Sequence, residues 1–250
     1  MINEMPEFNG PILITGASSD IGIALTRRML VTSNAHLGLH SYRSSERIYD
    51  LNKEFPGRIT PLQADLSDPN GVSAFADEVS VLGTPAAIVH LPAMKLKYEK
   101  FHKAQWKRLE DDFTIQVRCA FELLQRFLPK MAKLPRARVV FVLSSVVHGV
   151  PPKFMVPYVV TKYAQLGLMR AIAADYVSTT VRINAISPSM VETHFLDELG
   201  DLAIQMSASA NPLGRNAEPA DLLGALELFL TPASDFIHGT VLPIAAGMVS

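Results

Sequence analysis

Short apolar segments alternate with amphipathic segments along this whole chain, and no other feature of the sequence constrains its fold as strongly. Most of the apolar segments are rich in Val, Ile and Leu and contain no acidic residue, which predicts strands that are buried on both faces. The predicted strands are 11–15, 35–40, 59–64, 86–91, 138–143, 181–186 and 240–245, and the predicted helices are 21–31, 46–55, 72–82, 112–131, 158–177 and 219–230. Strands that alternate with helices form a parallel sheet covered by helices on both faces. The sequence therefore predicts an α/β protein with one doubly wound domain over residues 1–250.

Composition and charge exclude several other classes of protein. The 250 residues are 48% hydrophobic, which excludes a disordered chain, but no apolar run approaches the roughly 18–20 residues of a membrane helix. The formal net charge is −1 and no basic tract is present, which argues against nucleic acid as a partner. The first residues show no export signal, and the single cysteine, Cys119, excludes an internal disulfide. We therefore expect a cytoplasmic protein without a nucleic-acid, membrane or metal site, since no group of His, Cys, Asp and Glu has the spacing of metal ligands either.

A turn of small residues joins the first predicted strand to the first predicted helix. Its sequence over residues 15–22 is TGASSDIG. In a doubly wound sheet, ligands bind at the carboxyl ends of the strands, where such a turn lets backbone N–H groups at a helix N-terminus approach a pyrophosphate. Gly and Ser also serve tight turns without any ligand, so this segment alone leaves a purely structural role open.

A second pattern places a tyrosine and a lysine on one face of a helix. Tyr158 and Lys162 are four residues apart, which brings their side chains one helical turn from each other. An ammonium group about 4–5 Å from a phenolate lowers the pKa of the tyrosine by about two to three units, toward the range of a general acid or base. Tyr49 and Lys53 repeat the spacing, so the pattern alone carries little weight. Only Tyr158 also has a serine, Ser145, 13 residues upstream at the end of a buried strand.

Together these features resemble the short-chain dehydrogenase/reductase family, and the resemblance extends from the 15–22 turn to residues 242–247. It implies a Rossmann-like sheet, a nicotinamide cofactor, and catalytic roles for Ser145, Tyr158 and Lys162. Tyr158 would give a proton to the substrate carbonyl while NADPH or NADH delivers a hydride. Lys162 would lower the tyrosine pKa and hold the nicotinamide ribose, and Ser145 would hydrogen-bond the developing alkoxide.

The resemblance also assigns the contacts with the cofactor. Asp65 and Leu66, after the third strand, would lie beside the adenine, and segments 182–188 and 191–193 would clasp the nicotinamide. The implied cofactor-binding residues are Gly16, Ser18, Ser19, Asp20, Ile21, Gly22, Tyr42, Arg43, Ser44, Asp65, Leu66, His90, Pro92, Tyr158, Lys162, Pro188, Val191 and Thr193.

Three positions depart from the family pattern. Asp20 stands where the turn usually has a glycine; we favour a role as a helix cap, and the alternative is that its carboxylate weakens cofactor binding. Residues 90–93, His-Leu-Pro-Ala, replace the usual Asn-Asn-Ala-Gly, so His90 must take over or lose the contacts of an asparagine. Gln116 matches a usual asparagine that anchors a water in the proton relay, and we include it in the catalytic set, although an ordinary polar helix residue would look the same.

The end of the second strand indicates which cofactor binds. An acidic residue there selects NAD through the adenosine ribose, whereas a basic residue with small hydroxyls receives the 2′-phosphate of NADP. The segment 40–46 reads HSYRSSE and has no acid before Glu46. We expect Arg43 and Ser44 to bind the phosphate and Tyr42 to flank the adenine, which predicts a preference for NADPH over NADH.

The leading functional hypothesis is an NADPH-dependent carbonyl reductase. One alternative is a 3-oxoacyl thioester reductase that acts on an acyl carrier protein, and Arg136 supplies half of the basic pair expected for it. Another alternative is a non-catalytic member of the family that senses cofactor or serves as a structural subunit. The retained Ser145, Tyr158 and Lys162 argue against that second alternative.

Two further expectations concern the substrate and the assembly. Segment 193–213 mixes apolar and acidic residues and is expected to form a lid over an apolar part of the substrate. Family members form homodimers or homotetramers through the helices that begin near Asp112 and Tyr158, so we expect a homo-oligomer. The apolar residues expected to be exposed for that contact are Leu166, Met169, Ala173 and Tyr176.

Overall fold

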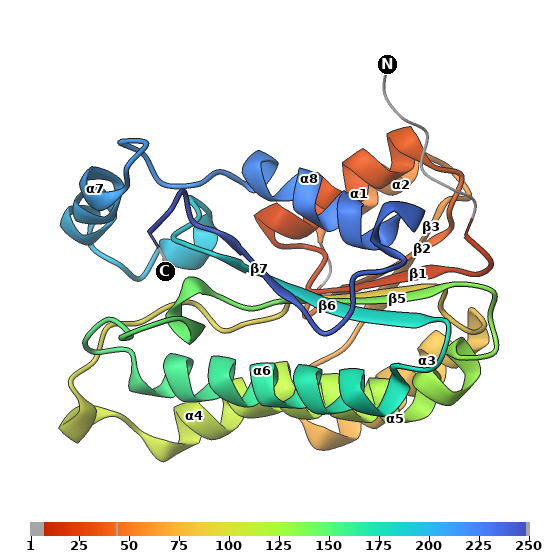
Figure 1. Ribbon diagram of the computed structural model, residues 1–250, viewed down its shortest axis with the longest axis horizontal. Helices are drawn as coiled ribbons and strands as arrows, with labels where there is room; N and C mark the ends of the chain where they lie inside the picture. The colour runs from red at the N-terminus through yellow and green to blue at the C-terminus, as the bar shows by residue number, and fades with distance from the viewer. Residues whose placement is uncertain (1–7, 44, 249–250) are drawn as a thin grey trace.

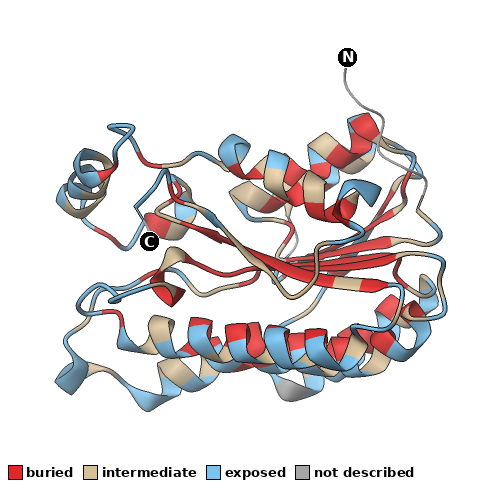
Figure 2. Cartoon of the chain, viewed as in Figure 1, coloured by how far each residue is buried: buried red, intermediate tan, exposed pale blue. Residues whose placement is uncertain are grey.

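The computed structural model describes residues 8–43 and 45–248, and a parallel sheet of seven strands runs through its centre (Figure 1). The strands are β1 (Ile12–Thr15), β2 (Leu37–Ser41), β3 (Ile59–Gln63), β4 (Ala87–His90), β5 (Ala137–Val142), β6 (Val181–Pro188) and β7 (Val241–Ile244). Their order is β3-β2-β1-β4-β5-β6-β7, and every pairing is parallel. Strands β1, β2, β4 and β5 are buried throughout (Figure 2), as strands with helices on both faces must be. The predicted doubly wound α/β fold is confirmed.

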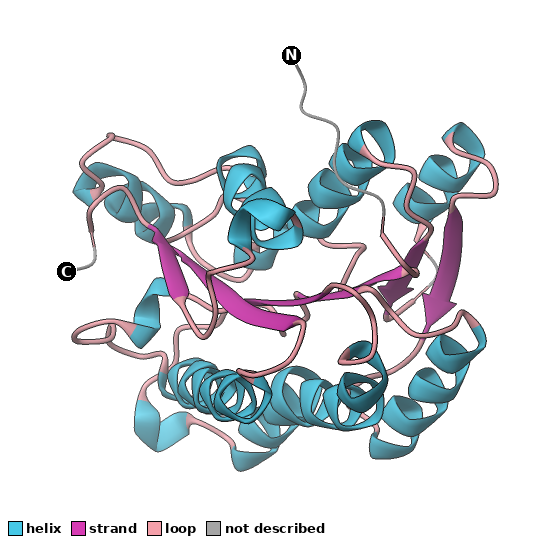
Figure 3. Ribbon diagram, turned by 45° about the vertical axis from the view of Figure 1, so that its right-hand side comes forward, coloured by secondary structure: helices cyan, strands magenta, loops and turns pink. Residues whose placement is uncertain are grey.

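Helices cover both faces of the sheet (Figures 1 and 3). They are α1 (Asp20–Thr32), α2 (Glu46–Glu54), α3 (Pro69–Val81), α4 (Trp106–Phe113), α5 (Cys119–Met131), α6 (Val156–Tyr176), α7 (Asp201–Ala210) and α8 (Pro219–Leu230). The short helical turns are η1 (Phe101–Lys103), η2 (Thr114–Arg118), η3 (Ser145–Val147), η4 (His194–Leu196) and η5 (Pro232–Ser234). Helices α1, α2 and α8 share one hydrophobic core with the sheet, and α3, α5 and α6 share the other. In the described part of the chain, no helix is long and apolar enough to cross a membrane.

The predicted helix over residues 112–131 is divided in the structure. After α4, the chain makes a π-helical turn, η2, before α5 continues. Phe113, Val117 and Phe121 recur at intervals of four, which predicts one buried face of a continuous helix, but the wider turn rotates the side chains that follow it and breaks this alignment. Val117 is buried, whereas Phe113 is 40% exposed and Phe121 50%.

One expectation about the surface is wrong. Leu166, Met169 and Ala173 lie in the core, and Tyr176 is half-buried, so this set does not form an exposed face of α6. Helix α6 packs along β6 and against α4, and these side chains fill the space between the elements. An apolar stripe that fits an oligomer contact fits the core of the single chain equally well.

Candidate active site

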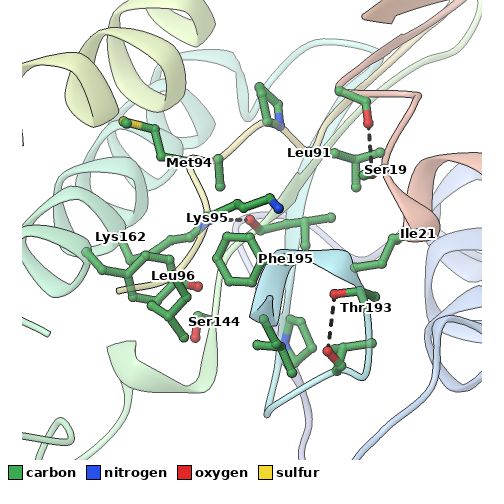
Figure 4. A pocket seen from close by; sticks show the side chains of 18 of the residues that line it. Ser19, Ile21, Leu91, Met94, Lys95, Leu96, Ser144, Lys162, Thr193 and Phe195 are labelled. Carbon is green, nitrogen blue, oxygen red and sulfur yellow. Dashed lines mark hydrogen bonds between the residues drawn. The ribbon is translucent and has the colours of Figure 1, made fainter. Parts of the chain in front are cut away.

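A pocket of about 1160 Å³ lies at the carboxyl ends of the strands (Figure 4). Its wall includes residues that follow six of the strands, namely Gly16, Tyr42, Asp65, Leu91, Leu143 and Ser189. The chain order in the sheet reverses between β1 and β4, and ligands of doubly wound sheets bind beside such a reversal. The volume exceeds that of a pocket for one small ligand, so a dinucleotide and a small substrate can fit together.

The small-residue turn after β1 forms one end of this pocket. Ser19 is the N-cap of α1: its Oγ accepts a hydrogen bond from the Gly22 N–H at 3.1 Å and donates one to the Gly16 carbonyl at 2.8 Å. Gly16 has a φ of 71°, and a Cβ there would lie 2.9 Å from the backbone nitrogen of Pro92. The turn therefore stays small and leaves the N-terminus of α1 facing the pocket, which suits the pyrophosphate of a dinucleotide.

Asp20 does not cap α1, and the capping interpretation is wrong because Ser19 already holds that position. The Asp20 carboxylate instead accepts hydrogen bonds from the backbone N–H of His194 at 2.8 Å and from Arg47 Nη1 at 2.8 Å, and it lies 3.0 Å from His194 Nδ1. Partial burial works to raise the pKa of Asp20, but these hydrogen bonds outweigh it and hold the pKa below its ordinary value. Asp20 thus joins the turn to α2 and to η4, which begins the predicted lid.

Replacing Asp20 with Asn is expected to lower the free energy of unfolding at pH 7 by about 1 kcal/mol, because both partners of the carboxylate are largely exposed. In a chain of this size, the melting temperature should fall by about 2–4 °C. The difference should begin to shrink as pH falls below about 4 and vanish only below the lowered pKa of Asp20, since the stability that such a carboxylate contributes is lost as pH falls through its folded-state pKa. Thermal unfolding at pH 7 and pH 3 measures it, and a variant that loses as much at pH 3 would contradict the account.

His40 is a buried histidine at the end of β2 that sequence reasoning did not identify. Its Nδ1 accepts a hydrogen bond from the Gly16 N–H at 3.1 Å, and its Nε2 lies 3.1 Å from the Ala64 carbonyl. A carbonyl only accepts, so Nε2 carries the proton. Burial lowers the pKa of His40 to about 4, so the ring is neutral at pH 7 and ties the turn to the end of β3.

His90 ends β4 and is fully enclosed behind the pocket wall. Its Nε2 donates a hydrogen bond to the Gln116 carbonyl at 2.8 Å, and its Nδ1 lies 2.9 Å from the Thr15 hydroxyl. Burial lowers the pKa of His90 to about 3, so this ring is neutral as well. His90 therefore ties β4 to β1 and to the π-helical turn.

Tyr158 and Lys162 both line the pocket, one turn apart at the start of α6. The Lys162 Nζ donates hydrogen bonds to the Val142 carbonyl at 2.8 Å and to Gln165 Oε1 at 3.2 Å, and it lies 5.7 Å from the centroid of the Tyr158 ring. Burial lowers the pKa of Lys162 to about 8. Burial also raises the pKa of Tyr158 and outweighs a hydrogen bond with Ser144, so the expected lowering of this pKa is wrong for the protein without cofactor.

Gln116 lies in the π-helical turn behind the pocket and is fully buried. Its carbonyl accepts hydrogen bonds from His90 Nε2 at 2.8 Å and from Gln165 Nε2 at 3.4 Å. Its own Nε2 donates to Asp112 Oδ1 at 2.6 Å. Sequence reasoning missed Asp112 and Gln165 as parts of this network, and the signal available was a polar residue within an apolar helical pattern.

Most of the predicted site residues line the pocket. They are Gly16, Ser18, Ser19, Asp20, Ile21, Tyr42, Asp65, Leu66, Pro92, Ser145, Tyr158, Lys162, Pro188, Val191 and Thr193. The structure does not bring Gly22, Arg43, His90 and Gln116 into the wall, and Ser44 lies outside the described residues.

The basic residue that borders the pocket beside β2 is Arg47, from the first turn of α2. Its Nη1 contacts Asp20 and also donates to the Ser18 carbonyl at 3.3 Å. The guanidinium of Arg43 lies 5.1 Å from the centroid of the exposed Tyr42 ring, at the pocket edge. Among residues 8–43 and 45–248, no group of three His, Cys, Asp or Glu side chains is placed to hold a metal ion.

Comparisons with known proteins agree with this architecture. A family profile described as enoyl-(acyl carrier protein) reductase matches residues 16–249. The 3-oxoacyl-[acyl-carrier-protein] reductase of Thermotoga maritima is 25% identical over 95% of this chain and 96% of its own length. The structure of L-sorbose reductase from Gluconobacter frateurii, complexed with NADPH and L-sorbose, has a TM-score of 0.84 at 21% identity and covers 99% of this chain and 98% of its own. The structure of 3-ketoacyl-(acyl-carrier-protein) reductase from Brucella melitensis, complexed with NADH, has a TM-score of 0.84 at 20% identity, with 96% and 98% covered.

Proposed function

Because the chain belongs to the short-chain dehydrogenase/reductase family of NAD(P)-dependent oxidoreductases, which act on alcohol and carbonyl groups, we propose that it is an NADPH-dependent carbonyl reductase with Tyr158 as its proton donor. The observation that carries this proposal is the position of Tyr158. Its side chain lies in the wall of the same pocket that the N-terminus of α1 enters. A cofactor bound along the turn and a carbonyl beside Tyr158 would therefore share one pocket.

The chain's own residues would supply the proton and the electrostatic support, and a bound nicotinamide would supply the hydride. Tyr158 keeps its proton at neutral pH because burial raises its pKa, which suits a group that donates a proton during reduction. Lys162 keeps most of its charge at pH 7, since its pKa is about 8, and that charge favours the phenolate left behind. The hydroxyls of Ser144 and Ser145 line the pocket, and either can donate a hydrogen bond to the developing alkoxide.

The preference for NADPH rests on the residues after β2. No acidic side chain stands between β2 and Glu46, so nothing there selects the free ribose hydroxyls of NADH. Arg43 and Arg47 place two guanidinium groups near this end of the pocket. Relatives of this fold are seen with either cofactor, so the choice depends on these local residues.

The substrate is expected to be a small carbonyl compound with an apolar part. Phe195, Leu196 and Met206, from the proposed lid over 193–213, give the pocket an apolar wall that excludes water. Arg136, the surface base expected to attract a carrier protein, already pairs with Asp235 through two contacts of 3.1–3.2 Å. We therefore propose a free carbonyl substrate rather than one bound to a carrier.

The test is an absorbance assay of NADPH oxidation across a carbonyl panel. The panel contains free ketones, 3-oxoacyl groups on a short pantetheine arm, and the same groups on an acyl carrier protein. Turnover of free ketones supports the proposal, and turnover of the carrier-bound group alone would favour the thioester reductase. Binding of NADPH with no turnover of any compound would favour a cofactor sensor or structural subunit.

We also propose that the chain forms a homo-oligomer through α4, α5 and α6. Exposed apolar side chains gather on these helices, and they are Trp106, Phe113, Phe121, Val160 and Tyr163. A monomer rarely exposes so many large apolar groups on neighbouring elements. Light scattering at micromolar concentration should give a dimer or tetramer, and a mass of 27.4 kDa, that of one chain, would contradict this.

A further inference from the structure

Asp112 is a carboxylate that the proposed function does not use, although it lies close to the proposed proton donor. It is 5% exposed, on the last turn of α4. Its Oδ1 accepts both of its hydrogen bonds, from Gln116 Nε2 at 2.6 Å and from the Met94 N–H at 3.2 Å. Within the described residues, Oδ2 has no hydrogen-bond partner, and no basic side chain forms an ion pair with the group. A buried carboxylate without such a pair favours its protonated form.

A small cavity separates Asp112 from solvent and reaches Tyr158. Its volume is about 20 Å³, which is enough to hold one water molecule. Asp112 and Tyr158 both line it, and the remaining wall includes four charged residues, Lys95, Lys97, Glu99 and Arg108. The side chains of Lys97 and Arg108 are partly exposed, so the cavity lies between the buried carboxylate and bulk water.

The surrounding polar groups connect the same carboxylate with Lys162. Gln165 accepts a hydrogen bond from Lys162 Nζ at 3.2 Å and donates one to the Gln116 carbonyl at 3.4 Å, and Gln116 donates to Asp112. Gln116 Oε1 is buried and has no partner among the described residues. A native protein seldom leaves such an atom unpaired, which indicates room for water in this network.

We propose that Asp112 is a proton-relay residue that returns a proton to Tyr158 after each reduction, through one water in the cavity between them. The inference rests on the proposed role of Tyr158 as proton donor. In this proposal, protons pass from solvent to Asp112 on α4 and then, through one water, to Tyr158.

The protons balance in three steps that contain four transfers. The Tyr158 O–H bond breaks when its proton passes to the substrate oxygen, which leaves a phenolate. The water then gives a proton to the phenolate and takes the proton from Asp112 Oδ2. The resulting Asp112 carboxylate regains a proton from solvent beside Lys97 and Arg108, so each reduction consumes one proton from bulk water.

The charges around Asp112 allow it to work in both forms. Burial raises the pKa of Asp112, while its hydrogen bonds and the charges of Lys162 and Arg108 work to lower it. Burial therefore keeps a proton on the group at a higher pH than an exposed aspartate would, and the two cations stabilise the carboxylate that forms during each cycle.

The variant Asp112→Asn tests the relay because the amide oxygen can keep both Oδ1 contacts while the transferable proton is lost. In rapid mixing of enzyme, NADPH and the fastest ketone of the panel, the first turnover should keep its wild-type rate, since Tyr158 starts with its proton. Later turnovers should slow by about tenfold or more and show an increased solvent deuterium isotope effect. Asp112→Glu should restore most of the later rate, and Glu110→Gln, which removes an exposed charge from the same helix, should change neither phase.

A second measurement does not depend on turnover. Infrared difference spectra between the wild type and Asp112→Asn, without cofactor, should keep the band of a protonated carboxyl group to a higher pH than an exposed aspartate, whose ordinary pKa is 3.8. Loss of half of this band at or below pH 3.8 would overturn the proposal, as would unchanged later turnovers. A purely structural role for Asp112 would slow the first turnover together with the later ones. If Tyr158→Phe leaves turnover intact, the proposed function itself fails; if only Asp112→Asn is without effect, this inference alone fails.

Discussion

Replacing Tyr158 with Phe is expected to lower the rate of carbonyl reduction by about a hundredfold or more. The substitution removes the phenolic hydroxyl and keeps the ring, which packs beside Phe195 with 6.0 Å between the ring centroids. The pocket should therefore keep its shape, and the affinity for NADPH, measured by fluorescence titration, should stay within a few-fold. Loss of turnover with intact cofactor binding separates the proton donor from a residue that supports the fold.

The chain contains a matched control for this substitution. Tyr49 and Lys53 have the same spacing on α2, and the Lys53 Nζ lies 4.2 Å from the Tyr49 ring centroid, closer than the corresponding 5.7 Å between Lys162 and Tyr158. Tyr49 is 59% exposed and lies outside the pocket wall. Tyr49→Phe should leave the rate of reduction unchanged. If both variants slow reduction equally, the assignment of the proton donor to the pocket tyrosine is wrong.

Replacing Arg43 with Ala is expected to raise the KM for NADPH by about 10- to 150-fold and to leave the KM for NADH nearly unchanged. A charge-assisted contact with the 2′-phosphate is worth about 1.5–3 kcal/mol, and NADH has no such phosphate. The Arg43 guanidinium lies over Tyr42, which lines the pocket, so it is near the end of the pocket where the 2′-phosphate is expected. Initial rates with each cofactor at a fixed saturating ketone concentration give the two constants.

Arg47→Ala provides the comparison, because Arg47 lines the pocket but is held by Asp20 and the Ser18 carbonyl. Loss of the Arg47 side chain should loosen the 15–22 turn, which is expected to bind either cofactor, so the KM for NADPH and the KM for NADH should rise together. If Arg47→Ala raises only the KM for NADPH and Arg43→Ala has no effect, the 2′-phosphate is bound by Arg47 at the start of α2 and not by Arg43 after β2.

Much of the fold could be predicted because it depends on local pattern. Strands such as β4 and β5 are apolar along their whole length, and only a sheet with helices on both faces buries such segments. The π-helical turn could not be predicted, since a wider turn arises from contacts across the fold, such as the hydrogen bond from His90 to the Gln116 carbonyl. The burial of Leu166 and Met169 depends equally on which elements pack against α6.

The candidate site divides along the same line. Residue types and spacing were enough to place Tyr158, Lys162 and the 15–22 turn at one end of the sheet. They were not enough to predict the direction of the pKa shift of Tyr158. The spacing shows that a lysine is near the phenol, but it does not show how deeply the phenol is buried, and burial has the larger effect. The partners of Asp20 were out of reach for a simpler reason: His194 lies 174 positions away in the chain.

The contact between Asp20 and His194 has a thermodynamic consequence for the proposed lid. One carboxylate serves both the turn expected to receive the pyrophosphate and the segment that leads into α7. The order of that segment and the occupancy of the turn are therefore linked variables. If a bound anion strengthens or weakens the Asp20–His194 contact by some free energy, that contact strengthens or weakens the binding of the anion by the same free energy. If an anion at the turn changes the Asp20–His194 contact, the affinity for the cofactor depends on residues 15–22 and on the segment after His194 together.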